Sequence, residues 1–257
     1  MDAISKIRQV YKRLEFIFLK IQVLIKSIWW RISGGVFPEP HSIPIIINNF
    51  NRLDSLKKLL HSLEIRGYSK IIILDNDSTY PPLLEFYDST SYEVVYLRKN
   101  IGSKALWESD VFRRFRRSFY VYTDSDVVLD NLCPSDFMQV LLKVLKKYPA
   151  CLKVGLGIRI DDLPDCYKEK EYAIWWESQF WKDRVDDLLF KARVDTTFAL
   201  YRPFCKGGST PHLVFRTDFP YVIQHLPWYQ DTENLSQEEK YYITHSKKAT
   251  FWTERLQ

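Results

Sequence analysis

The sequence is poor in the residues that build small metal-bound or disulfide-bonded frameworks. It has only four cysteines in 257 residues, and none of them forms a Cys-x-x-Cys pair or has a histidine at zinc-site spacing. They are Cys133, Cys151, Cys166 and Cys205. Zinc modules and secreted disulfide scaffolds show paired spacings, so we predict free thiols in a protein of a reducing compartment.

The chain also lacks an uninterrupted apolar run of membrane-spanning length. Its apolar N-terminal part is interrupted by Glu15, Lys20, Gln22 and Lys26, whereas a transmembrane helix needs about 20 consecutive apolar residues. The small-residue cleavage site that is typical of a signal peptide is absent too. We therefore expect this segment neither to cross a bilayer nor to be removed.

Core-forming side chains, in contrast, are plentiful. Hydrophobic residues make up 46% of the chain and aromatic residues 16%, which excludes a disordered protein. The length suits one large domain with an appendage. The net charge is +5, and the basic excess gathers in the first 35 residues, where Lys and Arg outnumber Asp2 and Glu15. Because no base-reading motif accompanies these cations, we expect no binding of nucleic acid.

Residues 1–36 are predicted to form a basic amphipathic helix. Apolar side chains recur there at alternating steps of three and four, which aligns them along one side of a helix. They are Ile4, Ile7, Tyr11, Leu14, Phe18, Ile21, Ile25, Ile28 and Ile32. A broad apolar face with basic flanks suits a membrane surface. The unbroken heptad pattern also suits packing on the domain itself or pairing with a second copy as a homodimer, and the sequence leaves these alternatives open.

The remainder of the chain, residues 37–257, alternates between predicted strands and helices. Strands are expected at 43–47, 70–74, 92–97 and 119–123, with helices at 55–66 and 104–115. This alternation predicts an α/β fold with a mostly parallel sheet flanked by helices. The strands run into polar residues, and ligands of such sheets bind beyond the carboxyl ends of the strands.

Four polar segments at these strand ends carry a resemblance to a known family. They are the Ile-Pro-Ile-Ile-Ile-x-x-Phe-Asn-Arg opening at 43–52, Leu74-Asp75-Asn76-Asp77-Ser78, Asn100-Ile101-Gly102 and Thr123-Asp124-Ser125-Asp126. In this order and spacing the chain resembles a GT-A fold glycosyltransferase of the family 2 type, as found in bacterial surface-polysaccharide synthesis. The resemblance covers about residues 43–130 and implies that this half binds a nucleotide sugar. Residues 131–257 would then hold the acceptor and a C-terminal tail.

The resemblance also implies a divalent metal ion at the Asp-x-Asp motif. Such an ion stabilises the charge that develops on a diphosphate leaving group, and Mn²⁺ and Mg²⁺ both favour carboxylate and phosphate oxygens. Asp126 would coordinate the ion directly, and Asp124 would face the ribose or a metal-bound water. Many enzymes of this fold add a late histidine to the metal, for which His225 is the candidate and His245 a weaker one. A lone histidine is nevertheless often a structural residue.

Further donor contacts are carried over from the family residue by residue. Asp75 would bind uracil or its counterpart on another nucleobase, and the loop that begins at Asn100 would lie across the ribose and the phosphates. The implied donor-binding residues are Asn51, Arg52, Asp75, Asn100, Gly102, Lys104, Asp124 and Asp126.

An inverting transfer needs a general base within reach of the acceptor hydroxyl, and Glu177 and Asp195 are the candidates. Glu177 lies in the aromatic segment 173–181, whose rings suit stacking on sugars but also suit a protein core. Asp195 lies at the start of the segment 194–201, which is expected to be a strand that enters the core. The acidic pair that family 2 enzymes carry on an acceptor-side helix is missing, so the base, and inversion itself, stay open. Residues 229–240 are expected to form a loop or lid.

The resemblance therefore implies a metal-dependent hexosyltransferase that moves a sugar from a UDP-sugar to a glycan or lipid-linked glycan. Its place would be the cytoplasm, including the cytoplasmic face of the membrane. One alternative is a non-catalytic nucleotide-sugar or glycan binding protein of the same fold, against which the intact Asp-x-Asp motif argues. Another is a nucleotidyltransferase, but the Gly-rich phosphate loop of that class is absent, because residues 48–52 contain no glycine.

Overall fold

The computed structural model describes residues 3–207 and 212–246. Its α-helices are α1 (Ala3–Ile32), α2 (Asp54–Glu64), α3 (Pro81–Ser89), α4 (Ala105–Glu108), α5 (Phe112–Phe115), α6 (Phe137–Lys147), α7 (Lys170–Ser178) and α8 (Gln237–His245). Three short 3-10 helices are η1 (Pro40–Ser42), η2 (Gln179–Trp181) and η3 (Leu226–Tyr229). The strands are β1 (Ile45–Asn49), β2 (Ile71–Asp75), β3 (Glu93–Tyr96), β4 (Tyr120–Asp124), β5 (Val127–Leu129), β6 (Lys153–Gly155), β7 (Gly157–Ile158), β8 (Leu189–Phe190), β9 (Ala199–Tyr201), β10 (Val214–Thr217) and β11 (Val222–His225).

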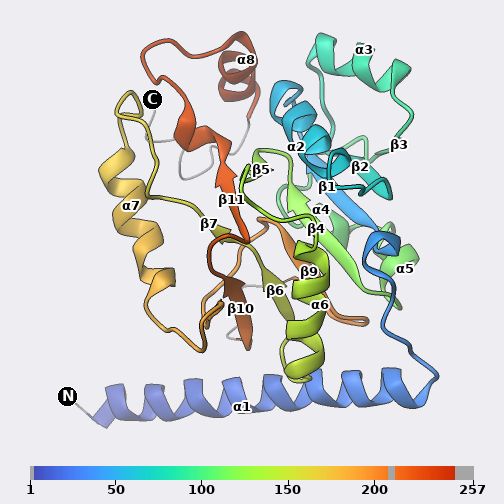
Figure 1. Cartoon of the computed structure of the whole chain (residues 1–257), viewed down its shortest axis with the longest axis vertical. Helices are drawn as coiled ribbons and strands as arrows, with labels where there is room; N and C mark the ends of the chain where they lie inside the picture. The colour runs from blue at the N-terminus through green and yellow to red at the C-terminus, as the bar shows by residue number, and fades with distance from the viewer. Residues whose placement is uncertain (1–2, 208–211, 247–257) are drawn as a thin grey trace.

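An eight-stranded central sheet organises the fold, in the order β3-β2-β1-β4-β9-β6-β10-β8 (Figure 1). β3, β2, β1 and β4 are parallel to one another, as are β6 and β10. β9 is antiparallel to both of its neighbours, and β8 is antiparallel to β10. A smaller sheet has the order β5-β11-β7. The predicted α/β fold, with a mostly parallel sheet flanked by helices and preceded by an N-terminal helix, is confirmed.

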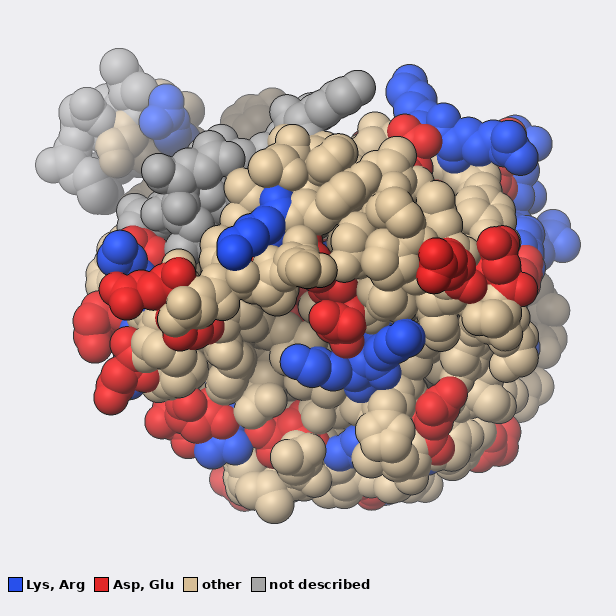
Figure 2. Space-filling model, turned by 90° about the horizontal axis from the view of Figure 1, so that it is seen from above, with Lys and Arg blue, Asp and Glu red and all other residues tan. Residues whose placement is uncertain are grey.

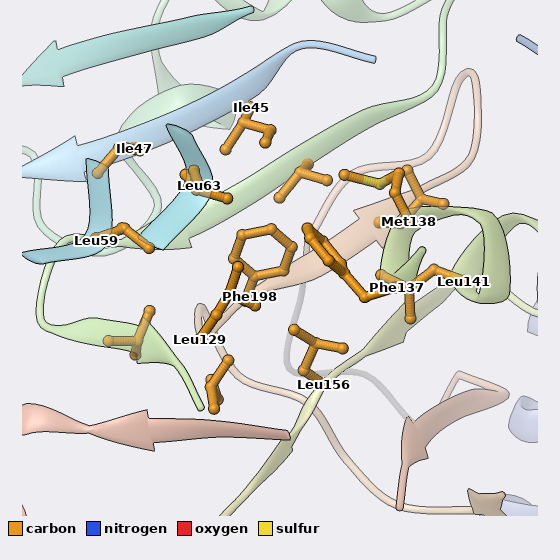
Figure 3. Close-up of a cluster of buried hydrophobic side chains, with 14 of the residues drawn as sticks. Ile45, Ile47, Leu59, Leu63, Leu129, Phe137, Met138, Leu141, Leu156 and Phe198 are labelled. Atoms are coloured by element: carbon orange, nitrogen blue, oxygen red, sulfur yellow. The ribbon is translucent and has the colours of Figure 1, made fainter. Parts of the chain in front are cut away.

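The isoleucine run of β1 is explained by burial of the central sheet on both faces. Successive side chains of a strand point to opposite faces. Ile45 and Ile47 pack in one core cluster with side chains of α2 and α6 (Figure 3), whereas Ile46 packs in a second cluster with Leu106 and Trp107. A strand with two buried faces reads as a continuous apolar run rather than an alternating one.

Several boundaries differ from the sequence expectations. The helix expected at 104–115 is divided into α4 and α5, because Ser109 between them has an extended backbone. The strand expected to start at Val194 begins only at Ala199. Residues 194–198 therefore form an irregular segment, which lies against the end of β4 through a hydrogen bond from the Asp124 N–H to the Thr196 carbonyl. All four cysteines are free, as predicted.

The expected loop or lid at 229–240 starts at the last residue of η3 and ends within α8, which is docked on the domain. The Ser236 hydroxyl accepts a hydrogen bond from the Glu239 N–H at 3.1 Å, as in a capping box. The buried carboxylate of Glu238 accepts hydrogen bonds from the N–H groups of Leu53 and Asp54, both at 2.6 Å. Glu238 thereby caps the N-terminus of α2 from a distant part of the sequence. Of the expected C-terminal tail after residue 240, residues 241–245 belong to α8, and residues 247–257 lie outside the described residues.

We predict that Glu238→Ala lowers the free energy of unfolding by about 1–2 kcal/mol, as expected for the loss of a helix cap. Stability would fall because two N–H donors at the N-terminus of α2 lose their acceptor. Urea denaturation followed by circular dichroism measures the change. The exposed Glu233 on the same segment is the matched control, and Glu233→Ala should change stability by less than about 0.5 kcal/mol. Equal effects of the two substitutions would refute the capping role.

Candidate active site

Strand pairing brings the Asp-x-Asp motif and His225 together. β4 ends at Asp124, and Val127 at the start of β5 pairs with His225 at the end of β11. The Leu226 N–H also donates to the Asp126 carbonyl at 2.8 Å. As a result, His225 Nε2 lies 3.9 Å from Asp126 Oδ2. The structure thus places two of the predicted metal ligands, from sequence positions 126 and 225, side by side.

Asp124 lies among polar groups from neighbouring segments. Asn48 Nδ2 donates to its Oδ1 at 3.4 Å, and the Thr196 hydroxyl donates to its Oδ2. Burial raises the pKa of Asp124 well above its ordinary value, and the charges of Asp126 and Asp195 raise it further. A bound cation would relieve this crowding of negative charge.

His225 has the protonation state that metal coordination requires. Its side chain is 12% exposed, and burial lowers its pKa below the ordinary value, although the charge of Asp126 acts in the opposite direction. The imidazole is therefore neutral near pH 7, which is the form that binds metals. Nδ1 has no hydrogen-bond partner among the described residues.

Asp124, Asp126 and His225 supply oxygen and nitrogen donors that suit Mn²⁺, but they form an incomplete cage. In the described ranges, no group of three or more His, Cys, Asp or Glu side chains is arranged to hold a metal ion by itself. Mg²⁺ in enzymes that bind nucleotides is usually held by one or two carboxylates together with substrate phosphates and water. These residues therefore fit a divalent ion that is completed by a diphosphate ligand.

Arg52 connects this site to α8. Its side chain is only 5% exposed, makes two hydrogen bonds to Glu239, and places Nε 3.9 Å from Asp126 Oδ2. The guanidinium also lies 3.9 Å from the ring centre of Tyr242. Burial opposes its charge, but Glu239 and then Asp126 outweigh burial and hold the pKa of Arg52 above its ordinary value. A permanently charged, planar donor group is thus fixed beside the Asp-x-Asp motif.

Asp75 ends β2 with one unused acceptor atom. The residue is 3% exposed, and its Oδ2 accepts a hydrogen bond from the Ser78 N–H at 3.1 Å. Its Oδ1 has no partner among the described residues. Burial raises the pKa of Asp75 above its ordinary value. A buried acceptor without a partner is costly, and an N–H group of a nucleobase would satisfy it.

Asn51, predicted to contact the donor, binds the protein backbone. It is fully buried with a positive φ of 53°, and its Oδ1 accepts hydrogen bonds from the N–H groups of Thr79 and Tyr80 at 2.7 and 3.0 Å. Asn51 therefore joins the loop after β1 to the loop after β2. Its predicted contact with a donor is not among these interactions and stays a prediction.

The loop that begins at Asn100 is held by Asn76, whose role the sequence did not reveal. Asn76 Oδ1 accepts a hydrogen bond from the Ile101 N–H at 2.8 Å, and its Nδ2 donates to the Gly102 carbonyl at 3.1 Å. Gly102 has a φ of +84°, which disfavours other residues there. Asn100 and Lys104 are exposed, so their side chains are accessible to a ligand.

The two candidate bases have different surroundings. Asp195 is exposed and adjoins Thr196, and its charge contributes to the raised pKa of Asp124. Glu177 is 2% exposed and forms a buried ion pair with Arg216. Burial raises the pKa of Glu177, and Arg216 acts against this shift. The structure thus groups Asp195 with the Asp-x-Asp motif and gives Glu177 a partner of its own.

Part of the aromatic segment on α7 is accessible. Trp175 and Trp176 are 66% and 38% exposed, respectively, and the rings of Tyr172 and Trp175 lie 5.3 Å apart. The sequence left open whether these rings belong to the core or to an acceptor wall. Their exposure places these two tryptophans outside the core.

The face of the molecule that carries α8 is seen from above in Figure 2. Acidic side chains lie in a hollow near the centre of this face, and Lys and Arg side chains lie beside them (Figure 2). Opposite charges around a recess suit a ligand that carries a diphosphate and a metal ion.

Comparisons with known proteins give matches only among solved structures. No protein-family model matches the chain, and no curated protein sequence matches it. It is similar to GalNAc-T7 with UDP, GalNAc and Mn²⁺, at 13% identity and a TM-score of 0.48, over 72% of this chain and 43% of that one. It is also similar to glucosyl-3-phosphoglycerate synthase from Mycobacterium tuberculosis with Mn²⁺, UDP-glucose and phosphoglyceric acid, at 14% identity and a TM-score of 0.41, over 63% and 56% of the two chains.

A third similar structure is a mycobacterial protein, at 15% identity and a TM-score of 0.44, over 77% of this chain and 69% of that one. The matched part spans less than two thirds of GalNAc-T7 and of the synthase. Because identities and TM-scores are low, the activity of this chain has to be argued from its own residues.

Proposed function

We propose that residues 37–257 form a metal-dependent glycosyltransferase that uses a nucleoside diphosphate sugar, with a UDP-sugar as the first candidate. The observation that carries the proposal is the grouping of Asp124, Asp126 and His225, with the buried Arg52 beside them. This combination suits a ligand that brings its own phosphate oxygens to a divalent ion. The four motif segments of the sequence support the same donor class.

Each residue has a role in this proposal. Asp126 and His225 hold Mn²⁺ or Mg²⁺, which supplies charge stabilisation to the departing diphosphate. Asp124 orients the ribose or a metal-bound water through its fixed carboxylate, and Arg52 donates to the phosphates in the bidentate manner typical of arginine. Asp75 accepts a hydrogen bond from the nucleobase.

Asp195 is the general base that we propose for the acceptor hydroxyl. It is exposed, so an acceptor can reach it, and its charge acts on both Asp124 and His225. A carboxylate near the donor can take the hydroxyl proton as the new glycosidic bond forms, which is the requirement of an inverting transfer. Glu177 is the less favoured base because Arg216 occupies its carboxylate.

The acceptor we propose is a glycan or a lipid-linked glycan in polysaccharide biosynthesis on the cytoplasmic side of a membrane. The exposed faces of Trp175 and Trp176 support this class, because the C–H faces of sugar rings stack on aromatic side chains. On the donor side, the side chains of Asn100 and Lys104 are exposed and can contact the ribose and the phosphates.

Release of the nucleoside diphosphate from a panel of nucleotide sugars tests the proposal. We expect one UDP-sugar to release UDP slowly in the presence of Mn²⁺, with water as the acceptor, and EDTA to stop the release. Asp195→Asn should retain metal-dependent donor binding while turnover falls by about 100-fold or more, the usual contribution of a general base.

Two other outcomes would overturn the assignment. Metal-dependent nucleotide binding without turnover, with water or with any glycan acceptor, would favour the non-catalytic binding protein. Release of pyrophosphate from a nucleoside triphosphate would instead identify a nucleotidyltransferase.

A further inference from the structure

Helix α1 has two apolar faces, and only one of them packs against the domain. Val23 and Trp30 are buried at 3% and 8% exposure and belong to the two core clusters. Ser27 lies between them on the same side, and its hydroxyl donates to the Pro149 carbonyl at 2.8 Å. Through these contacts α1 packs as a straight helix along one end of the molecule (Figure 1).

The other apolar face, here called the outer stripe, is exposed. It comprises the periodic apolar residues from Ile7 to Ile32, which are 49–79% exposed. At 100° per residue, the outer stripe lies on the side of the helix opposite Val23 and Trp30. The periodicity of the sequence therefore marks a surface that points away from the domain. Exposed apolar surface of this extent is rare in monomers unless it has a binding partner.

Basic side chains border the outer stripe along both edges. Arg8 and Lys26 are exposed on one edge, and Arg13 and Arg31 are exposed on the other. Glu15 is the single acidic side chain in the described part of α1. The helix thus presents an apolar band with two basic side chains on each edge. None of the described helices, α1 included, is both long and apolar enough to cross a membrane.

The outer stripe could be covered either by a second copy of α1 or by a lipid surface. In a two-helix coiled coil, the positions beside the seam usually carry complementary charges. Here those positions include Val10 and Ile17, which are 55% and 51% exposed and widen the apolar band. They also include Arg8 and Arg31, for which the described part of a second α1 offers only Glu15 as an opposite charge. Anionic headgroups, in contrast, complement both basic edges.

We propose that α1 binds flat on an anionic lipid bilayer, with the outer stripe between the headgroups and the acyl chains. An apolar band that runs from Ile7 to Ile32, about 39 Å at 1.5 Å per residue, supplies the partition into the interface. Each flanking Lys or Arg adds attraction to acidic headgroups. The proposal does not depend on the catalytic activity, because it rests on α1 alone.

Cosedimentation of the full chain with vesicles tests the proposal. We expect binding to vesicles of phosphatidylcholine and phosphatidylglycerol, at least tenfold weaker binding to pure phosphatidylcholine, and release by salt. Leu14→Glu with Ile25→Glu should abolish binding. Replacing Arg8 and Lys26 by glutamine should weaken it about fivefold per charge. Leu132→Glu is the matched control, because Leu132 is a 62% exposed leucine outside α1, and it should bind like the unmodified chain.

Three results would overturn the proposal. The first is the absence of binding to anionic vesicles, and the second is an equal loss of binding in the Leu132→Glu control. The third is an unmodified chain that is a dimer in light scattering and does not bind vesicles, while the Leu14→Glu/Ile25→Glu variant is a monomer. Circular dichroism establishes that the variants are folded. Thermal stabilisation by UDP with Mn²⁺, measured on the same variants, reports separately on the proposed function, so that the two proposals can fail independently.

Discussion

Replacing Asp126 with alanine is expected to abolish the metal-dependent stabilisation of this protein by a nucleoside diphosphate. A ligand at about 100 times its dissociation constant stabilises the folded state by about 2.7 kcal/mol. The variant should lose this gain, because the diphosphate and the ion hold each other in place and Asp126 is the carboxylate nearest to His225. Thermal unfolding with UDP and Mn²⁺, each alone and together, measures the effect.

The control for this experiment is another aspartate outside the site. The side chain of Asp110 is 88% exposed and forms an ion pair with the exposed Arg113, so Asp110→Ala should keep the full shift. An Asp126→Ala variant that is stabilised as strongly as the unmodified chain would refute the metal site. So would an unmodified chain that is stabilised by UDP equally well in EDTA.

Replacing Arg216 with methionine is expected to lower the free energy of unfolding by about 3–5 kcal/mol, the usual cost of breaking a buried ion pair. The side chains of Arg216 and Glu177 are 4% and 3% exposed. The guanidinium also donates to the Arg193 carbonyl at 2.6 Å and lies 4.3 Å from the ring centre of Phe180. Without Arg216, the carboxylate of Glu177 stays buried with no counter-charge.

The pH dependence provides the signature of this ion pair. In the Arg216→Met variant, burial holds the pKa of Glu177 above its unfolded value of about 4.3, so the folded state prefers the protonated acid. The stability deficit is therefore small near pH 4 and grows as the pH rises through the folded pKa. Urea midpoints at pH 5 and pH 8 measure the difference.

Two further variants sharpen this experiment. Glu177→Leu combined with Arg216→Met should regain most of the lost stability, because no buried charge remains. The exposed Arg113 pairs with Asp110 on the surface, and Arg113→Met should cost less than about 1 kcal/mol. A deficit of the Arg216→Met variant that stays below 1 kcal/mol at pH 8 would contradict the structural role of the pair.

The fold of residues 43–130 could be predicted because its signals are local. The isoleucine runs at 45–47 and 71–73 mark strands with two buried faces, and polar residues follow directly where parallel strands end. Because these strands are parallel, Asp75 and Asp124 lie at the same end of the sheet, beyond which ligands bind. His225 could be predicted as a partner of Asp126 only from the family resemblance. The two residues meet through the pairing of β5 with β11, which are far apart in the sequence.

Other parts of the candidate site had no signal in the sequence. A strand was expected to begin at Val194, but β9 begins at Ala199. The irregular segment before β9 lies beside β4, where the Thr196 hydroxyl donates to Asp124. The capping pattern from Ser236 to Glu239 predicts the beginning of a helix, but a local pattern cannot indicate that Glu239 pairs with Arg52. Long-range contacts of this kind depend on the whole packing of the domain.

The neighbouring residues Glu238 and Glu239 give α8 an energetic connection to the proposed donor site. Glu238 holds the helix on the first turn of α2, while Glu239 would compete with the phosphates of the proposed donor for the guanidinium of Arg52. A ligand that draws Arg52 away from Glu239 weakens the docking of α8. By thermodynamic reciprocity, undocking of α8 strengthens the binding of that ligand by the same factor. Ligand affinity and the detachment of α8 are therefore two measurements of a single coupling free energy.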